Sequence, residues 1–141
     1  MDMTIIVAII SAVASVIAAA LTFWFTKLKE REAEVRKQKL EHYRDLVNSF
    51  SGIVGSDDTP EGQKHFALAC NNLSLIASQE VLIALQAFQL EIRKSNPEPS
   101  IERHDALLKN LLLAIRSDLG LAKKDDEEKL NFHIWCSGAN G

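Results

Sequence analysis

A long uncharged segment near the N-terminus constrains this chain more than any other feature of the sequence. No residue from Met3 to Thr26 carries a charge, and the segment shows no polar stripe at helical spacing. About 20 apolar residues are enough to cross the hydrocarbon core of a bilayer as a helix. The sequence therefore predicts a transmembrane helix over residues 5–26, preceded by a short external N-terminus over residues 1–4.

The charges that flank this segment indicate its orientation. Asp2 precedes it, whereas Lys27, Lys29 and Arg31 follow it. Because positive charge close to a span stays on the cytoplasmic side, we expect the N-terminus outside and the C-terminal part of the chain in the cytoplasm. A cleaved signal peptide ending at the small residues 18–20 is the alternative, but signal peptides carry their positive charge before the apolar segment.

Small residues recur within the predicted span at four-residue spacing. Ser11, Ser15 and Ala19 would lie on one side of the helix, and Ala8 and Ala12 repeat the spacing; small side chains there let two helix backbones approach closely. The spacing predicts self-association of the span through this face. The alternative is that the small residues are ordinary constituents of a membrane helix.

A densely charged segment follows the span. Residues 27–45 contain seven Lys or Arg and five acidic residues, with no Gly or Pro to interrupt a helix. We therefore expect residues 27–39 to form a charged stalk that continues the membrane helix. The partners implied are the lipid bilayer and either further copies of the chain or another protein.

Beyond the stalk, apolar residues recur at steps of three and four, which predicts amphipathic helices. Four are expected: the continuation of the first helix to residue 54, then helices over 61–77, 79–94 and 101–119. Thr59, Ser78 and Ser100 are placed to cap the last three, and Gly120 is placed to end the fourth. The predicted apolar stripes are Leu40, Tyr43, Val47, Phe50 and Val54, widened by Leu46 and Ile53; Phe66, Ala69, Cys70, Leu73 and Ala77; Val81, Leu82, Leu85, Phe88 and Ile92; and Ile101, His104, Leu108, Leu111 and Ile115, with Leu107 and Leu112.

The predicted fold class is all-α, with a cytosolic four-helix bundle over residues 40–120 and a linker and short extended tail over residues 121–141. Residues 130–136 alternate between apolar and polar side chains in the manner of a strand. A lone strand leaves its backbone groups unpaired, so we expect the tail to lie along the bundle or to pair with a second copy.

Charge and motif content exclude several functions. The chain has 16 Lys and Arg against 19 Asp and Glu, and an acidic domain repels the phosphates of nucleic acids. No phosphate-binding loop, nucleophile elbow or zinc-protease motif occurs. Cys70 and Cys136 form no paired-cysteine motif, and a cytoplasmic location predicts reduced thiols. We therefore expect no cofactor, no bound metal and no catalytic activity.

One short motif suggests a different function. Arg103-His104-Asp105 resembles the HD phosphohydrolases, helical enzymes that bind metals through a His, a His-Asp pair and a later Asp. The resemblance implies His65, His104, Asp105 and Asp118 as ligands. Only 13 residues separate Asp105 from Asp118, and His104 lies on an apolar stripe, so a metal-dependent hydrolase is the second alternative rather than the leading function.

Several polar and aromatic residues are not required by a plain bundle. These are the candidate interaction residues: His42, Asn72, Arg116, Asp118, Phe132 and Trp135. Together with the small-residue face of the span, they favour a membrane-anchored module that binds itself or a protein partner. The first alternative is a membrane-perturbing effector that clustering activates, as in phage defence.

Five stretches also support a resemblance: residues 36–43 (RKQKLEHY), 69–73 (ACNNL), 101–105 (IERHD), 115–120 (IRSDLG) and 135–138 (WCSG). With these stretches the chain resembles a group of small bacterial membrane proteins with one N-terminal span and a cytosolic helical domain. The resemblance implies a bacterial inner membrane and an anchored helical domain. It implies no activity.

Overall fold

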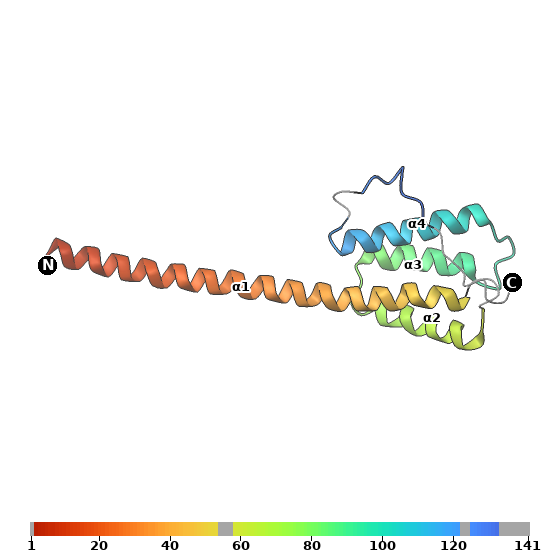
Figure 1. Cartoon of the computed structure of the whole chain (residues 1–141), viewed down its shortest axis with the longest axis horizontal. Helices are drawn as coiled ribbons and strands as arrows, with labels where there is room; N and C mark the ends of the chain where they lie inside the picture. The colour runs from red at the N-terminus through yellow and green to blue at the C-terminus, as the bar shows by residue number, and fades with distance from the viewer. Residues whose placement is uncertain (1, 54–57, 122–124, 133–141) are drawn as a thin grey trace. The chain divides into compact units, whose positions relative to one another are not determined.

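The computed structural model describes residues 2–53, 58–121 and 125–132. These residues form four α-helices and one short 3-10 helix, and they contain no strand (Figure 1). The helices are α1 (Met3–Phe50), α2 (Pro60–Leu73), α3 (Gln79–Ile92) and α4 (Ile101–Asp118), and the 3-10 helix η1 covers Ser51–Ile53. The prediction of an all-α chain with a long apolar first helix is confirmed.

The chain divides into two compact units, residues 1–37 and residues 38–141. The first unit contains the apolar part of α1, in which every described side chain is exposed. The hydroxyls of Ser15, Thr22 and Thr26 donate to the backbone carbonyls four residues earlier, at 2.8, 2.9 and 2.8 Å. By length and composition, this helix can cross a membrane. In lipid, such internal hydrogen bonds satisfy polar groups that have no water to bind.

The second unit has one hydrophobic core, to which all four helices contribute. The buried apolar residues are Tyr43, Leu46 and Phe50 of α1; Phe66, Ala69, Cys70 and Leu73 of α2; Val81, Leu85 and Phe88 of α3; and Leu108, Leu111 and Ile115 of α4, followed by Leu119. Rings of Phe50, Phe66 and Phe88 meet in the core, with centroids 6.0 and 5.7 Å from Phe50. Most of the predicted stripes of α2, α3 and α4 therefore face this core.

Three residues of the predicted stripes are exposed instead of buried. Leu40 and Val47 are 44% and 45% exposed, and α1 presents Tyr43, Leu46 and Phe50 to the core. Ile101 is 83% exposed because it occupies the first position of α4, at the edge of the core. Val54 lies outside the described residues. The predicted stripe of α1 was therefore too broad: Tyr43, Leu46 and Phe50 lie in the core and Ile53 packs against it, whereas Leu40 and Val47 lie at its exposed edges.

The predicted helix starts are confirmed. The hydroxyls of Thr59, Ser78 and Ser100 each accept a hydrogen bond from the backbone N–H of the third residue of α2, α3 and α4. Gly120 follows α4 with φ of 75°, a left-handed conformation that glycine adopts at little cost. Helix α2 ends four residues before the predicted position, because residues 74–76 form a turn.

Two glycines allow η1 to lie against the start of α2. A Cβ atom on Gly62 would stand 2.2 Å from the carbonyl oxygen of Gly52, so no larger residue is accommodated at this backbone contact. Thr59 N–H also donates to this carbonyl, at 3.3 Å. The contact fixes how the chain turns from α1 into α2.

Candidate interaction sites

The small-residue face of α1 is accessible. Ser11, Ser15 and Ala19 are all exposed, and the Ser15 hydroxyl donates a hydrogen bond to the backbone carbonyl of Ser11. The side chains on this face are small, and the Ser15 hydroxyl already has a hydrogen-bond acceptor. A surface of this kind suits close packing of a second helix in lipid.

Asp118, the last residue of α4, joins three segments of the second unit. Lys39 Nζ of α1 donates to both carboxylate oxygens, at 2.8 and 3.0 Å, and the Tyr43 hydroxyl donates to one of them. The backbone N–H of Ser78, the residue that caps α3, lies 3.4 Å from the same carboxylate. The Asp118 side chain is 9% exposed. One of the candidate interaction residues thus makes its contacts inside the domain.

The charges around Asp118 explain how a carboxylate is tolerated there. Burial alone would raise the pKa of Asp118, but the hydrogen bonds from Lys39 and Tyr43 outweigh it and hold the pKa below its usual value. Burial and the bond to Asp118 raise the pKa of Tyr43, so its hydroxyl remains a donor. A negative charge opposes the dipole at a helix C-terminus, and the Lys39 ammonium compensates for it.

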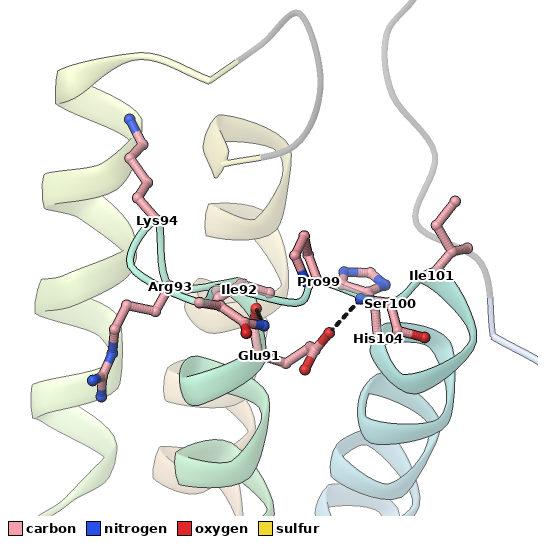
Figure 2. Close-up of a pocket in the computed structure, with 9 residues that line it drawn as sticks. Glu91, Ile92, Arg93, Lys94, Pro99, Ser100, Ile101 and His104 are labelled. Carbon is pink, nitrogen blue, oxygen red and sulfur yellow. Dashed lines mark hydrogen bonds between the residues drawn. The ribbon is translucent and has the colours of Figure 1, made fainter.

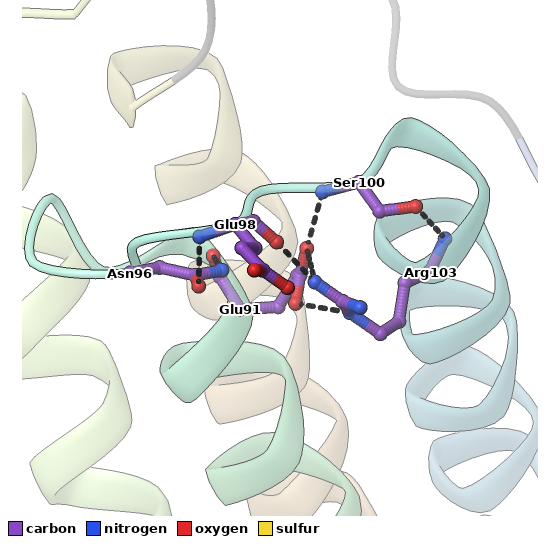
Figure 3. Close-up of polar contacts among 5 residues, drawn as sticks. All are labelled: Glu91, Asn96, Glu98, Ser100 and Arg103. Carbon is purple, nitrogen blue, oxygen red and sulfur yellow. Dashed lines mark hydrogen bonds and ion pairs between the residues drawn. The ribbon is translucent and has the colours of Figure 1, made fainter.

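Glu91, near the C-terminal end of α3, organises the loop that leads into α4 (Figure 3). Its carboxylate accepts from Arg103 Nε at 2.8 Å and from the backbone N–H of Ser100 at 2.8 Å. Its backbone carbonyl accepts from the Asn96 amide at 2.9 Å. Arg103 also donates to the backbone carbonyl of Glu98. Glu91 is a buried acid, but its carboxylate oxygens accept hydrogen bonds. The bonds from Arg103 and Ser100 lower the pKa of its carboxyl group.

These two carboxylates predict an acid-sensitive domain. A group whose pKa is lowered by folding stabilises the folded state above its unfolded pKa, and this contribution disappears as pH falls through the folded pKa. We expect the urea midpoint to be constant from pH 7 to about pH 5 and to fall below about pH 4. Urea titrations of the wild type and Asp118→Asn across this range check it. The variant should show a weaker pH dependence, and an equally steep fall would contradict the role of Asp118.

A pocket of about 560 Å³ lies between the end of α3 and the start of α4 (Figure 2). Apolar walls come from Ile92, Pro99 and Ile101, together with the imidazole of His104. The His104 ring also contacts Phe88 of the core, with centroids 5.3 Å apart. Polar residues, among them Glu91, Arg93 and Lys94, complete the lining. The pocket could not be predicted from the sequence, because its walls come from a loop and two helix ends.

Arg116 binds the segment that follows α4. Its Nε and Nη2 atoms donate to the two carboxylate oxygens of Asp125, both at 2.7 Å, in the paired geometry that arginine and carboxylate favour. The bond lowers the pKa of Asp125. The sequence identified Arg116 as an interaction residue, and the structure shows a partner within the same chain.

The remaining candidate interaction residues are more dispersed. His42 is half-buried on α1, Asn72 is exposed on α2, and Phe132 is half-buried at the end of the described segment 125–132. Residues 130–132 belong to no regular element, and Trp135 lies outside the described residues, as does most of the segment predicted to be extended.

The residues implied by the resemblance to HD phosphohydrolases are held in separate contacts. His65 lies 2.8 Å from Asp45, His104 lies 3.1 Å from Asp105, and Asp118 binds Lys39 and Tyr43. Among the described residues, no three His, Cys, Asp or Glu side chains are grouped so that they could hold a metal ion.

Cys70 is buried among core side chains, and burial raises the pKa of its thiol to about 11. We expect a maleimide to modify Cys70 of the native protein slowly and to modify it rapidly in denaturing urea, since the thiolate is the reactive form. Mass spectrometry of a Cys136→Ser variant, which retains only this thiol, measures both rates. Equal rates with and without urea would show that Cys70 is accessible in the folded domain.

Comparisons with protein-family models, with curated proteins and with solved structures found no match.

Proposed function

We propose that this chain is a membrane-anchored interaction module whose cytosolic part is a four-helix bundle that associates with copies of itself or with a protein partner. One observation carries the proposal: every described side chain of α1 up to Gln38 is exposed, and the first 24 residues of this helix are uncharged. Exposed apolar surface on this scale requires lipid or another apolar surface to cover it.

The second unit supports the other half of the proposal. Its four helices share one core, and its polar clusters at Asp118 and Glu91 are saturated by groups of the same chain. A domain of this kind provides a stable surface rather than a group of reactive side chains. Lys27, Lys29 and Arg31, which directly follow the apolar segment, favour a cytoplasmic location for this domain in a bacterial inner membrane.

Membrane extraction tests the anchor. Full-length protein should remain with the membrane fraction after washing at alkaline pH, and it should require detergent for release. Deletion of residues 1–26 should move the protein to the soluble fraction. A control chain in which an unrelated Leu-Ala segment replaces residues 5–26 should remain in the membrane, and release of the full-length chain by the wash would refute an integral anchor.

Light scattering of the detergent-extracted chain tests self-association. Replacing Ser11, Ser15 and Ala19 together with isoleucine should shift an oligomer toward the monomer if the small-residue face is the contact, because larger side chains separate the backbones. Isoleucine at Val13 and Ala20, on the opposite side of the helix, is the control. An unchanged mass in the first variant would place the contact elsewhere, and a monomeric parent would leave only a different protein as partner.

A membrane-perturbing effector is the second candidate, because the same exposed face would bring spans together when the cytosolic domains cluster. Overexpression should then arrest growth and depolarise the membrane. The chain with the unrelated Leu-Ala segment should be harmless. Growth unaffected by the wild-type chain, at equal membrane levels, would reject this function.

A further inference from the structure

The pocket between α3 and α4 has apolar walls but no described apolar group within it. Ile101, which forms part of its wall, is 83% exposed, and Pro99 is also exposed. Three charged residues also line the pocket: Glu91 is bound by Arg103 and Ser100, Lys94 lies 3.7 Å from Asp58, and Arg93 is exposed. The surface that the pocket presents is mainly apolar, which favours an apolar or aromatic side chain as its occupant.

The segment that follows α4 starts close to this helix and turns back along it. The paired Arg116–Asp125 contact fixes residue 125 beside the C-terminal part of α4. In Figure 1, residues 125–132, drawn in dark blue, run from that end of α4 back toward its N-terminal end. Leu130 and Phe132 of this segment are half-buried.

The chain beyond residue 132 is long enough to reach the pocket. Arg116 and Ile101 are 15 positions apart on α4, which corresponds to about 22 Å along the helix axis. Asp125 and Trp135 are ten positions apart, and an extended chain of that length covers up to about 33 Å. A segment that starts at Asp125 therefore reaches the pocket with length to spare.

We infer that the pocket between α3 and α4 is the docking site for Ile134 and Trp135 of the same chain. These are the large apolar residues in the part of the sequence that follows residue 132. An indole ring fills a substantial part of a pocket of about 560 Å³ and keeps one polar edge for the open side. Docking would cover Ile101, so the tail acts as an internal ligand that a partner must displace to use this pocket.

Tryptophan fluorescence of the full chain in detergent tests this inference. In a Trp24→Phe background, Trp135 is the sole tryptophan, and we expect its emission to be shifted to short wavelength and protected from acrylamide. Ile101→Asp places a charge in the pocket wall and should make Trp135 emit and quench like a solvent-exposed indole. Ile83→Asp changes another exposed isoleucine, 59% accessible on α3 and outside the pocket, and should have no effect. A solvent-like Trp135 in the parent, or an unchanged spectrum in Ile101→Asp, would overturn the inference.

Disulfide formation distinguishes docking within one chain from exchange between two. Ile101→Cys should form an intramolecular disulfide with Cys136 under mild oxidation, at least about tenfold faster than Ile83→Cys, because docking raises the local concentration of the two thiols. Cys70 is buried and has a raised pKa, so it does not compete. Disulfides formed only between two chains would assign the pocket to the tail of a second copy and refute docking within the chain. Membrane extraction is measured separately, so failure here leaves the proposed anchor untouched.

Discussion

Replacing Leu46 with alanine is expected to lower the free energy of unfolding of the helical domain by about 2–5 kcal/mol, the usual cost of removing a fully buried leucine. Leu46 has no exposed surface and lies on α1 between Tyr43 and Phe50 in the core. Domains of this size have total stabilities of only about 5–15 kcal/mol, so the variant should be extensively weakened.

The neighbouring residue provides the control for this prediction. Val47 is 45% exposed, and Val47→Ala should change the free energy of unfolding by less than about 0.5 kcal/mol. Urea titrations followed by maleimide labelling of Cys70, in the Cys136→Ser background, report unfolding of the domain without interference from the apolar part of α1. Equal losses in the two variants would mean that α1 is rotated about its axis relative to the structure.

Replacing Asp118 with alanine is expected to cost about 1–3 kcal/mol, because it leaves the Lys39 ammonium and the Tyr43 hydroxyl without their acceptor. Asp105→Ala, at an exposed position of the same helix, is the control and should have little effect. The same labelling assay in urea measures both variants.

A double substitution shows whether the cost arises from the unpaired lysine. Lys39→Met with Asp118→Ala removes both charges of the pair, and it should be less destabilising than the sum of the two single changes. Strictly additive losses would indicate that Asp118 acts through Tyr43 and Ser78 rather than through Lys39.

The sequence was sufficient to predict the helices and most of their ends. Thr59, Ser78 and Ser100 were identified as caps because a hydroxyl before an apolar repeat has a local role that requires no tertiary information. The absence of charge from residue 3 to residue 26 likewise identified the apolar part of α1 without reference to the rest of the chain.

Features that depend on contacts between distant residues could not be predicted. Periodicity assigned both Leu46 and Val47 to the apolar stripe of α1, because both positions lie three or four residues from Tyr43 and Phe50, and only the packing shows that Leu46 is buried and Val47 exposed. Lys39 and Asp118 are 79 residues apart, and their pairing follows from how α1 and α4 pack. Glu91 appeared in the sequence as one more acid on a helix, and only the path of the loop brings Ser100 and Arg103 to it.

The bonds made by Glu91 also limit how this protein can vary in length. The network around Glu91 includes Asn96, Glu98, Ser100 and Arg103. Its geometry depends on the number of residues between each of these groups and Glu91. An insertion or deletion anywhere between Arg93 and Pro99 would move several of these groups out of register at once. This exposed loop, unlike most surface loops, is therefore expected to accept changes of side chain at its two prolines more readily than a change of one residue in its length.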